Sequence, residues 1–251
     1  MKILAIINQK GGVGKSTTAH ALGAGLTLKG NKVLYVDLDA QGNLSYTLKA
    51  NASGYNSLGV LERPETIKEE IQITSEGAIL ASAAKLASAD KNIVETGKEY
   101  RLRKALKLIA EEYDYCIIDT PPTLGIVTIN ALTACDYAII PAQADIYSLQ
   151  GLVGQINETI KAVKEYCNSE LKVIGIVLTR FSARSILSRD LAEVIEETAQ
   201  KLDTKVFNTK IRECISIKEA QVSQKDIYSY APRSNAAADY KELLEEVMKE
   251  M

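Results

Sequence analysis

The sequence predicts an α/β fold, in which helices cover both faces of one doubly wound, mainly parallel sheet. Strand-length apolar runs alternate with stretches of helical spacing along the whole chain, and this alternation is typical of right-handed βαβ units. The composition, with 46% hydrophobic and 25% charged residues, is that of an ordinary globular protein. No linker, internal repeat or low-complexity tract interrupts the sequence. We therefore expect a single three-layer domain over residues 1–251.

The spacing of apolar residues places the individual elements. In the first half of the chain we expect strands at 2–7, 33–36, 77–81 and 115–118, helices at 16–29 and 100–112, and short helices around 58–61. The stretch 100–112 is amphipathic, because Leu102, Leu106 and Ile109 fall on one face of a helix. In the second half we expect strands at 137–140 and 171–178, and helices at 149–166, 187–201 and 236–250.

Composition and charge exclude several classes of protein. With 30 Lys and Arg against 32 Asp and Glu, the net charge is -2, so any contact with nucleic acid requires a local basic patch. No apolar run approaches the ~20 residues of a membrane span. The single His and the absence of a C-x-x-C pair argue against a zinc site. Free cysteines and an N-terminus without a signal-peptide pattern indicate a cytoplasmic protein.

A glycine-rich segment, called here the phosphate loop, connects the first expected strand to the first expected helix at residues 8–17. Its glycines let backbone N–H groups turn inward around a polyphosphate, and the following helix adds its positive end. Lys15 would reach the β- and γ-phosphates, and the Ser16 hydroxyl would ligate Mg²⁺. The strict pattern departs at Gln9, where glycine is usual. The predicted nucleotide-binding residues are Lys10, Gly11, Gly12, Val13, Gly14, Lys15, Ser16 and Thr17.

Aspartates follow two further strands, where ligands bind in parallel sheets. Asp37 and Asp39 end the strand at 33–36, and Asp119 ends the strand at 115–118. Carboxylates at these places hold metal-bound water or orient an attacking water. Polar turns after strands also carry aspartates for purely local reasons, so the pattern alone leaves both interpretations open.

The segment 10–17 resembles the deviant Walker A motif of the ParA/MinD family of ATPases, which have the P-loop NTPase fold of the SIMIBI type. The resemblance implies that Lys10 crosses a dimer interface to the partner's nucleotide, so that two ATP molecules lie between two subunits. Residues 36–43 are similar to the family's D-x-D-P-Q-G-N switch segment, with Ala40 in place of proline. This match implies that Asp39 positions the hydrolytic water and belongs with Ser16 and Asp119 to the metal site, and that Asp37 supports it and the metal. By the same resemblance Asp119 is the Walker B carboxylate, and 124–132 the second switch segment.

Later segments are similar to the ParA/Soj branch, which moves plasmid or chromosomal DNA. The resemblance implies that Thr179 and Arg180 lie beside the adenine and that Arg212 lies on the loop bordering it. Arg184 matches an arginine with which that branch binds DNA non-specifically. A second such arginine is replaced by Ser216, and Arg212 and Lys218 are candidates to substitute for it. The branch further implies a slow ATPase, an ATP-dependent homodimer, a ParB-like centromere-binding partner and association with the nucleoid.

Other functions remain as alternatives at this point. A MinD-like or other positioning ATPase would act on a non-DNA cargo, but the acidic tail at 240–251 argues against a lipid-binding helix. An iron-protein-like electron carrier would need a cysteine soon after the strand at 115–118, where residues 120–125 offer none. A small-molecule kinase or ligase and a non-enzymatic nucleotide-binding scaffold are the remaining alternatives. Retention of Lys15, Ser16, Asp39 and Asp119 argues against the scaffold.

Overall fold

The structure, a computed structural model, describes residues 1–251 apart from 52 and 202, and the side chains of 149–153 and 201 also lie outside the description. Among the described residues an eight-stranded sheet has the order β3-β4-β2-β5-β1-β6-β7-β8. The strands are β1 (Lys2–Ile6), β2 (Val33–Asp37), β3 (Gln72–Thr74), β4 (Gly77–Leu80), β5 (Tyr115–Asp119), β6 (Tyr137–Gln143), β7 (Lys172–Phe181) and β8 (Ile211–Arg212).

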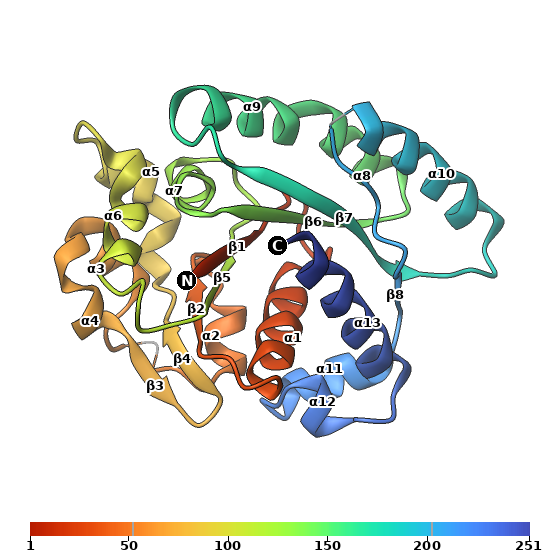
Figure 1. The fold of residues 1–251 in the computed structure, drawn as a ribbon, viewed down its shortest axis with the longest axis horizontal. Helices are drawn as coiled ribbons and strands as arrows, with labels where there is room; N and C mark the ends of the chain where they lie inside the picture. The colour runs from red at the N-terminus through yellow and green to blue at the C-terminus, as the bar shows by residue number, and fades with distance from the viewer. Residues whose placement is uncertain (52, 202) are drawn as a thin grey trace.

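Helices cover both faces of this sheet, as Figure 1 shows. One face carries α1 (Lys15–Leu28), α2 (Asn43–Thr47), α11 (Ile215–Val222), α12 (Ile227–Tyr230) and α13 (Asn235–Glu250). The other carries α3 (Ser57–Glu62), α4 (Ile67–Glu70), α5 (Ala89–Asn92), α6 (Arg101–Lys107), α7 (Ile126–Ala134), α9 (Asn157–Tyr166) and α10 (Ile186–Lys201). The short helix α8 (Ile146–Gly151) follows β6. These three layers confirm the predicted fold class. No helix among the described residues is long and apolar enough to cross a bilayer.

The two hydrophobic cores follow from the alternation of side chains along each strand. In β5, Cys116 and Ile118 belong to the core on the α6 side, whereas Ile117 belongs to the core on the α1 side. In β1, Leu4 and Ile6 likewise face α1. Both faces of the central strands are therefore apolar, which explains why these strands read as unbroken hydrophobic runs.

The long C-terminal helix closes the core on the α1 side. Ser234 accepts a hydrogen bond from the N–H of Ala237 (3.1 Å) and so caps α13. Tyr240, Leu243 and Val247 are buried in the core, while Glu242, Glu245 and Glu250 are exposed. The apolar residues of this tail therefore pack inside the molecule and are not presented to a lipid surface.

Two helices differ from the expected ranges. The stretch 100–112 is helical only over α6, because the chain tightens after Lys107 and the N–H of Ile109 bonds to the carbonyl of Leu106 (3.3 Å). Ile109 is nevertheless buried as its spacing predicts. The expected helix at 149–166 is divided into α8 and α9, with a π-helical stretch at 152–156 in which Gly154 (φ -91°, ψ -120°) is not helical. Glycine permits such a break at little steric cost.

The strand directions bring the loops of interest together. All neighbouring strands pair in parallel except β3 with β4. The loops that follow β1, β2, β5, β6 and β7 therefore leave the same edge of the sheet. In register, Asp119 at the end of β5 lies beside Ile6 of β1 on one side and Asp37 of β2 on the other.

Candidate nucleotide-binding site

The phosphate loop has the backbone shape of an anion cradle. Gly12 (φ +75°) and Gly14 (φ +90°) are in the left-handed region, where other residues are strained. Gly14 directly precedes α1, whose first turn contains no acidic residue. Free N–H groups at this helix start and in the loop favour a negatively charged ligand.

Lys15 supplies a cation inside the cradle. Its side chain is almost fully buried, and Nζ donates a hydrogen bond to the carbonyl oxygen of Lys10 (3.2 Å). Burial lowers the pKa of Lys15, and the nearby Asp119 and Asp39 act in the opposite direction. A buried ammonium whose one hydrogen bond among the described residues is to a loop carbonyl is well placed to take a stronger anionic partner.

Neighbouring strands fix the loop through its backbone. Asn8 donates to the carbonyl of Pro141 (2.6 Å) and accepts from the N–H of Lys10 (2.9 Å). Gln143 of β6 donates to the carbonyl of Gly12 (3.2 Å). The Thr179 hydroxyl donates to the carbonyl of Val13 (2.8 Å). The carbonyls of Gly12 and Val13 are thus bonded to side chains of β6 and β7, which hold the phosphate loop against the sheet. Thr179, which was predicted to lie near the base, therefore also supports the phosphate loop.

Asp37 binds the switch segment rather than facing an open space. Oδ1 accepts from the N–H of Asp39 (3.1 Å), while Oδ2 accepts from both the N–H (2.8 Å) and the hydroxyl (2.7 Å) of Ser45. Burial raises the pKa of Asp37 to about 6, although these hydrogen bonds act against the shift. Asp37 thus orders the switch loop, and Ser45 is a residue that sequence reasoning missed.

Asp119 is the unsatisfied group of the site. It is fully buried, and neither of its carboxylate oxygens has a hydrogen-bond partner among the described residues. Burial, followed by the charge of Asp37, raises the pKa of Asp119 well above its usual range. Such a carboxylate is costly unless a cation or a donor reaches it. Its place beside Lys15 and Ser16 fits Mg²⁺ with its bound water, which is the role predicted for Asp119 and Ser16.

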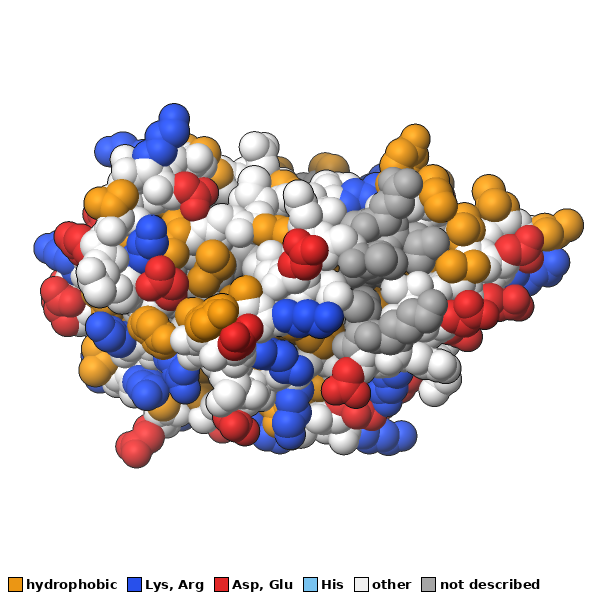
Figure 2. Space-filling model, turned by 90° about the horizontal axis from the view of Figure 1, so that it is seen from above, with side chains coloured by type: hydrophobic (Ala, Val, Ile, Leu, Met, Phe, Trp, Pro, Cys, Tyr) orange, Lys and Arg blue, Asp and Glu red, His pale blue; other side chains and the backbone are white. Residues whose placement is uncertain are grey.

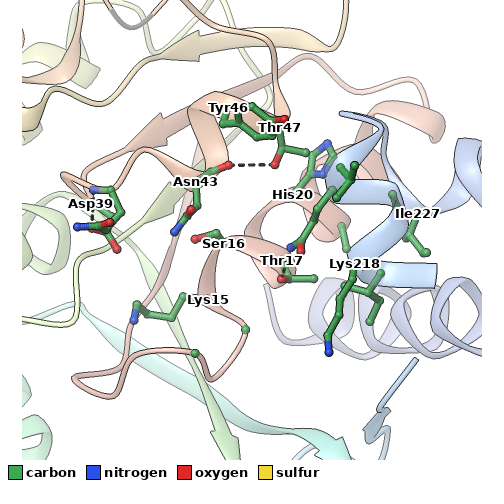
Figure 3. Close-up of a pocket in the computed structure, with 18 of the residues that line it drawn as sticks. Lys15, Ser16, Thr17, His20, Asp39, Asn43, Tyr46, Thr47, Lys218 and Ile227 are labelled. Carbon is green, nitrogen blue, oxygen red and sulfur yellow. Dashed lines mark hydrogen bonds between the residues drawn. The ribbon is translucent and has the colours of Figure 1, made fainter. Parts of the chain in front are cut away.

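Asp39 reaches the same opening from the switch segment. It is mostly buried, and its Oδ1 accepts from the N–H of Gln41 (3.0 Å). Figure 3 shows Asp39, Asn43 and Lys15 around one opening, with Ser16 between them. The three aspartates lie at the same edge of the sheet but in different environments: the Asp37 carboxylate is hydrogen-bonded, Asp39 lines the opening and Asp119 is enclosed.

A cavity of about 640 Å³ extends from the phosphate loop along α1. Its basic lining residues are Lys15, Arg180, Lys218 and Lys225, and it continues past His20 and Tyr46 toward Ile227. A smaller cavity of about 80 Å³ adjoins it between the ends of β7 and β8, where Thr179, Arg180 and Arg212 lie. Arg180 has φ +49° at an irregularity in the pairing of β7 with β8. The predicted base-contacting residues therefore gather at one end of the predicted phosphate site.

The predicted basic residues do not form one group. Arg212 makes a two-pronged ion pair with Asp239 of α13, in which Nε lies 3.1 and 3.0 Å from the two carboxylate oxygens. Lys218 lines both cavities. Arg184 is exposed on the loop between β7 and α10. The sequence offered no signal for the Arg212–Asp239 pair, because the two residues are 27 positions apart.

Comparison with known proteins agrees with this geometry. A family model described as an AAA domain matches residues 1–173. The chain is 39% identical over 251 residues to the sporulation initiation inhibitor protein Soj of Bacillus subtilis, with 98% of each chain covered. It is 38% identical to the chromosome partitioning protein ParA of Myxococcus xanthus, over 99% of this chain and 88% of the relative.

Solved structures show the same architecture over almost the whole chain. Cobyrinic acid a,c-diamide synthase from Mycobacterium smegmatis, with bound ADP and magnesium, is 32% identical with a TM-score of 0.85, covering 99% of this chain and 94% of that one. A plasmid partition protein from Borrelia burgdorferi bound to AMPPNP is 25% identical with a TM-score of 0.83, covering 100% and 99%. With the phosphate loop and switch aspartates in place, these similarities show that the chain belongs to the ParA/Soj family of partition ATPases.

Proposed function

We propose that this chain is an ATP-dependent DNA partition protein that works as a nucleotide-sandwich dimer. ATP binding joins two subunits, the dimer binds DNA without regard to sequence, and hydrolysis releases it. The observation that carries the dimer is the divergence of the two lysines on one loop. Lys15 lines the cavity, whereas Lys10 extends away from it to Asp145. A lysine on the phosphate loop that does not serve its own site is available to another.

Mg²⁺ and ATP are the ligands that the cavity suits best. The volume of about 640 Å³ accommodates a nucleoside triphosphate. Lys15 and the N–H groups before α1 bind the β- and γ-phosphates, while Ser16 and Asp119 hold the metal and its water. The smaller cavity beside Arg180 receives the base. Support for this assignment also comes from the ADP–magnesium and AMPPNP complexes of the similar structures.

Hydrolysis of ATP requires the protein mainly to position the attacking water and to neutralise charge. Asp39, held by the switch segment, orients the attacking water, and Lys15 with Lys10 of the partner subunit neutralises the charge that develops on the transferred phosphoryl group. When Mg²⁺ is bound it draws charge from the same oxygens. Without a partner protein these groups are incompletely aligned, so intrinsic turnover is slow. A ParB-like protein is the stimulating partner.

DNA binding rests on local rather than global charge. Figure 2 shows Lys and Arg side chains interspersed with Asp and Glu over the visible face, in line with the net charge of -2. Arg184 is exposed, whereas Arg212 is neutralised by Asp239. One subunit therefore offers few phosphate contacts, and two joined subunits double them. In the cell this places the ATP-bound dimer on the nucleoid and the free subunit in the bacterial cytoplasm.

The test separates dimerisation from hydrolysis with two variants. Asp39→Ala keeps both lysines and removes the residue that orients the water, so it should accumulate as a dimer with ATP and Mg²⁺. Lys10→Ala keeps its own cavity, so it should bind ATP by calorimetry but remain a monomer by light scattering. A Lys10→Ala protein that dimerises as well as wild type would contradict the sandwich arrangement.

A further inference from the structure

Lys10 is held within its own subunit by an ion pair. Its Nζ lies 2.6 Å from Oδ2 of Asp145, which follows β6, and each side chain is only about 30% exposed. The centroid of the Tyr147 ring lies 5.9 Å from the same Nζ. The lysine that the proposed function sends to a second subunit thus already has an anionic partner in its own chain.

Asp145 is a fixed partner rather than a mobile surface group. Its Oδ1 accepts from the N–H of Ser148 in the first turn of α8 (2.9 Å), and the Ser148 hydroxyl lies 3.3 Å from Oδ2. Ser148 is itself buried and its hydroxyl accepts from the N–H of Gln143 (3.3 Å). Gln143 in turn donates to Gly12 of the phosphate loop (3.2 Å). The carboxylate is therefore anchored to the same strand end that holds the loop.

The charge states suit a permanent pair at neutral pH. Partial burial tends to raise the pKa of Asp145, but hydrogen bonds from Lys10 and Ser148 outweigh it and hold that pKa below its usual value. The other acidic groups near the phosphate loop, Asp39 and Asp119, act on Lys15 instead. Asp145 is thus the carboxylate that Lys10 must leave if it moves.

We propose that Asp145 is a positioning residue that holds Lys10 in its own subunit and gives it up only to the phosphates of a second subunit's nucleotide. This inference rests on the proposed function, since it requires the sandwich dimer. The triphosphate carries more negative charge than one carboxylate and therefore displaces Asp145 from Lys10, whereas a weaker anion does not. Premature association without ATP is thereby disfavoured, and the exchange at two sites makes dimerisation depend steeply on bound nucleotide.

The test is the change Asp145→Asn, which removes the charge but keeps the side-chain oxygen that caps α8. Partly exposed ion pairs are worth up to ~1 kcal/mol, which is about fivefold. The dimer dissociation constant with ATP and Mg²⁺, from sedimentation velocity in the hydrolysis-deficient Asp39→Ala background, should therefore fall about fivefold per subunit and about 25-fold for both. Asp190→Asn, the same change at an exposed position of α10, is the matched control and should leave the constant unchanged.

A double-mutant cycle identifies Lys10 as the carrier of the effect. Lys10→Ala, a monomer at the concentrations used for light scattering, should associate only weakly at much higher concentration, and Asp145→Asn should not tighten that weak dimer. If it tightens this dimer by the same factor, the effect is charge repulsion between subunits and the proposal is overturned. A dimer that is unchanged or weaker in Asp145→Asn also overturns the proposal. Asp145 would then have no effect on dimerisation, or would guide Lys10 toward the partner subunit.

A second measurement works on the nucleotide-free subunit and does not need a dimer. Lys10 released from Asp145 should react faster with an amine-acylating reagent, so its labelling by mass spectrometry should rise several-fold in Asp145→Asn and stay unchanged in Asp190→Asn. Unchanged labelling in Asp145→Asn overturns the proposal. If wild type never dimerises with ATP but labelling rises, the sandwich dimer fails while the intrasubunit restraint on Lys10 stands.

Discussion

At the scale of single residues, the site places two buried carboxyl groups side by side. Asp37 and Asp119 are register neighbours at the ends of β2 and β5, and burial raises the pKa of each. Their ionised forms oppose one another as well as the low-dielectric surroundings. A bound Mg²⁺ relieves both costs, so metal binding and the stability of the strand ends are coupled.

This arrangement predicts an unusual pH dependence of stability without nucleotide. Because the folded pKa of Asp37 is about 6, the folded state holds its proton in a range where the unfolded state has lost it. The contribution of Asp37 to the free energy of unfolding should therefore fall by about 1.4 kcal/mol as pH rises from about 5 to 7.5. Titration of the buried His20, whose pKa burial lowers, works in the opposite direction.

The test compares the free energy of unfolding of wild type and of Asp37→Asn, measured by urea denaturation at about pH 5 and about pH 7.5. Asp37→Asn should gain stability relative to wild type as pH rises. A difference that does not change with pH would contradict the prediction. Saturating Mg²⁺ and ATP should flatten the wild-type dependence, because the cation stabilises the ionised carboxylates.

A second prediction at this scale concerns Lys15. Its ammonium is buried and bonds to a loop carbonyl that phosphate oxygens would replace. Removing it in Lys15→Ala should cost about 3 kcal/mol of ATP binding, or more than a hundredfold in affinity. Lys161→Ala, an exposed lysine on α9, is the control and should bind normally. Calorimetry that finds near-normal affinity in Lys15→Ala would remove the phosphate-loop assignment.

At the scale of elements, α1 is positioned by how closely it approaches the sheet. A Cβ atom at Gly23 would overlap the ring of Tyr35 in β2, which is itself buried and donates from its hydroxyl to the carbonyl of His20 (3.4 Å). The helix can therefore lie against β2 only because position 23 has no side chain. This close contact fixes the direction in which α1 leaves the phosphate loop.

Gly23→Ala should consequently destabilise the protein despite the higher helix propensity of alanine. Overpacking of a filled core costs about 1–3 kcal/mol, so the midpoint of chemical unfolding should fall. Leu28→Ala, at an exposed position of the same helix, should change stability little. Stability equal to or above that of wild type in Gly23→Ala would show that α1 can shift without cost.

The sequence predicted those elements whose own residues determine them. Long apolar strands such as β5 and periodic helices such as α13 lie where their spacing indicates. The short strands β3 and β8 were missed because three and two residues carry no period. The break at Gly154 was missed because an isolated glycine inside a helical pattern is usually tolerated.

The candidate site divides in the same way. Lys15 and Ser16 could be named from the glycine loop itself, whereas Asp39 and Asp119 could be named from their strand ends only together with the family resemblance. The partners that decide their charge and orientation come from distant segments: Ser45 for Asp37 and Asp145 for Lys10. A single sequence holds no signal for such pairs, since only the folded sheet brings the segments together.

At the scale of the whole molecule, DNA binding should require ATP, ignore base sequence and weaken steeply with salt. Each neutralised phosphate adds about -0.9 to the log–log salt slope. Arg184→Ala should reduce affinity equally on unrelated duplexes and flatten that slope, without changing ATP affinity. Arg63→Ala, exposed after α3, is the control. The assay is fluorescence anisotropy with NaCl titration in ATP or ADP. An ATP-bound dimer without affinity at low salt would indicate a positioning ATPase with a non-DNA cargo.

The two outermost strands of the sheet determine whether copies of this protein can pair with one another edge to edge. Both outermost strands are very short: β3 has three residues and turns back antiparallel on β4, and β8 has two. A long bare strand at either border would expose a row of backbone donors and acceptors to any neighbouring molecule and invite fibrous aggregation. Because the outermost strands are so short, neither offers a neighbouring molecule a long edge to pair with, so contacts between copies held at high local concentration should be set by side chains.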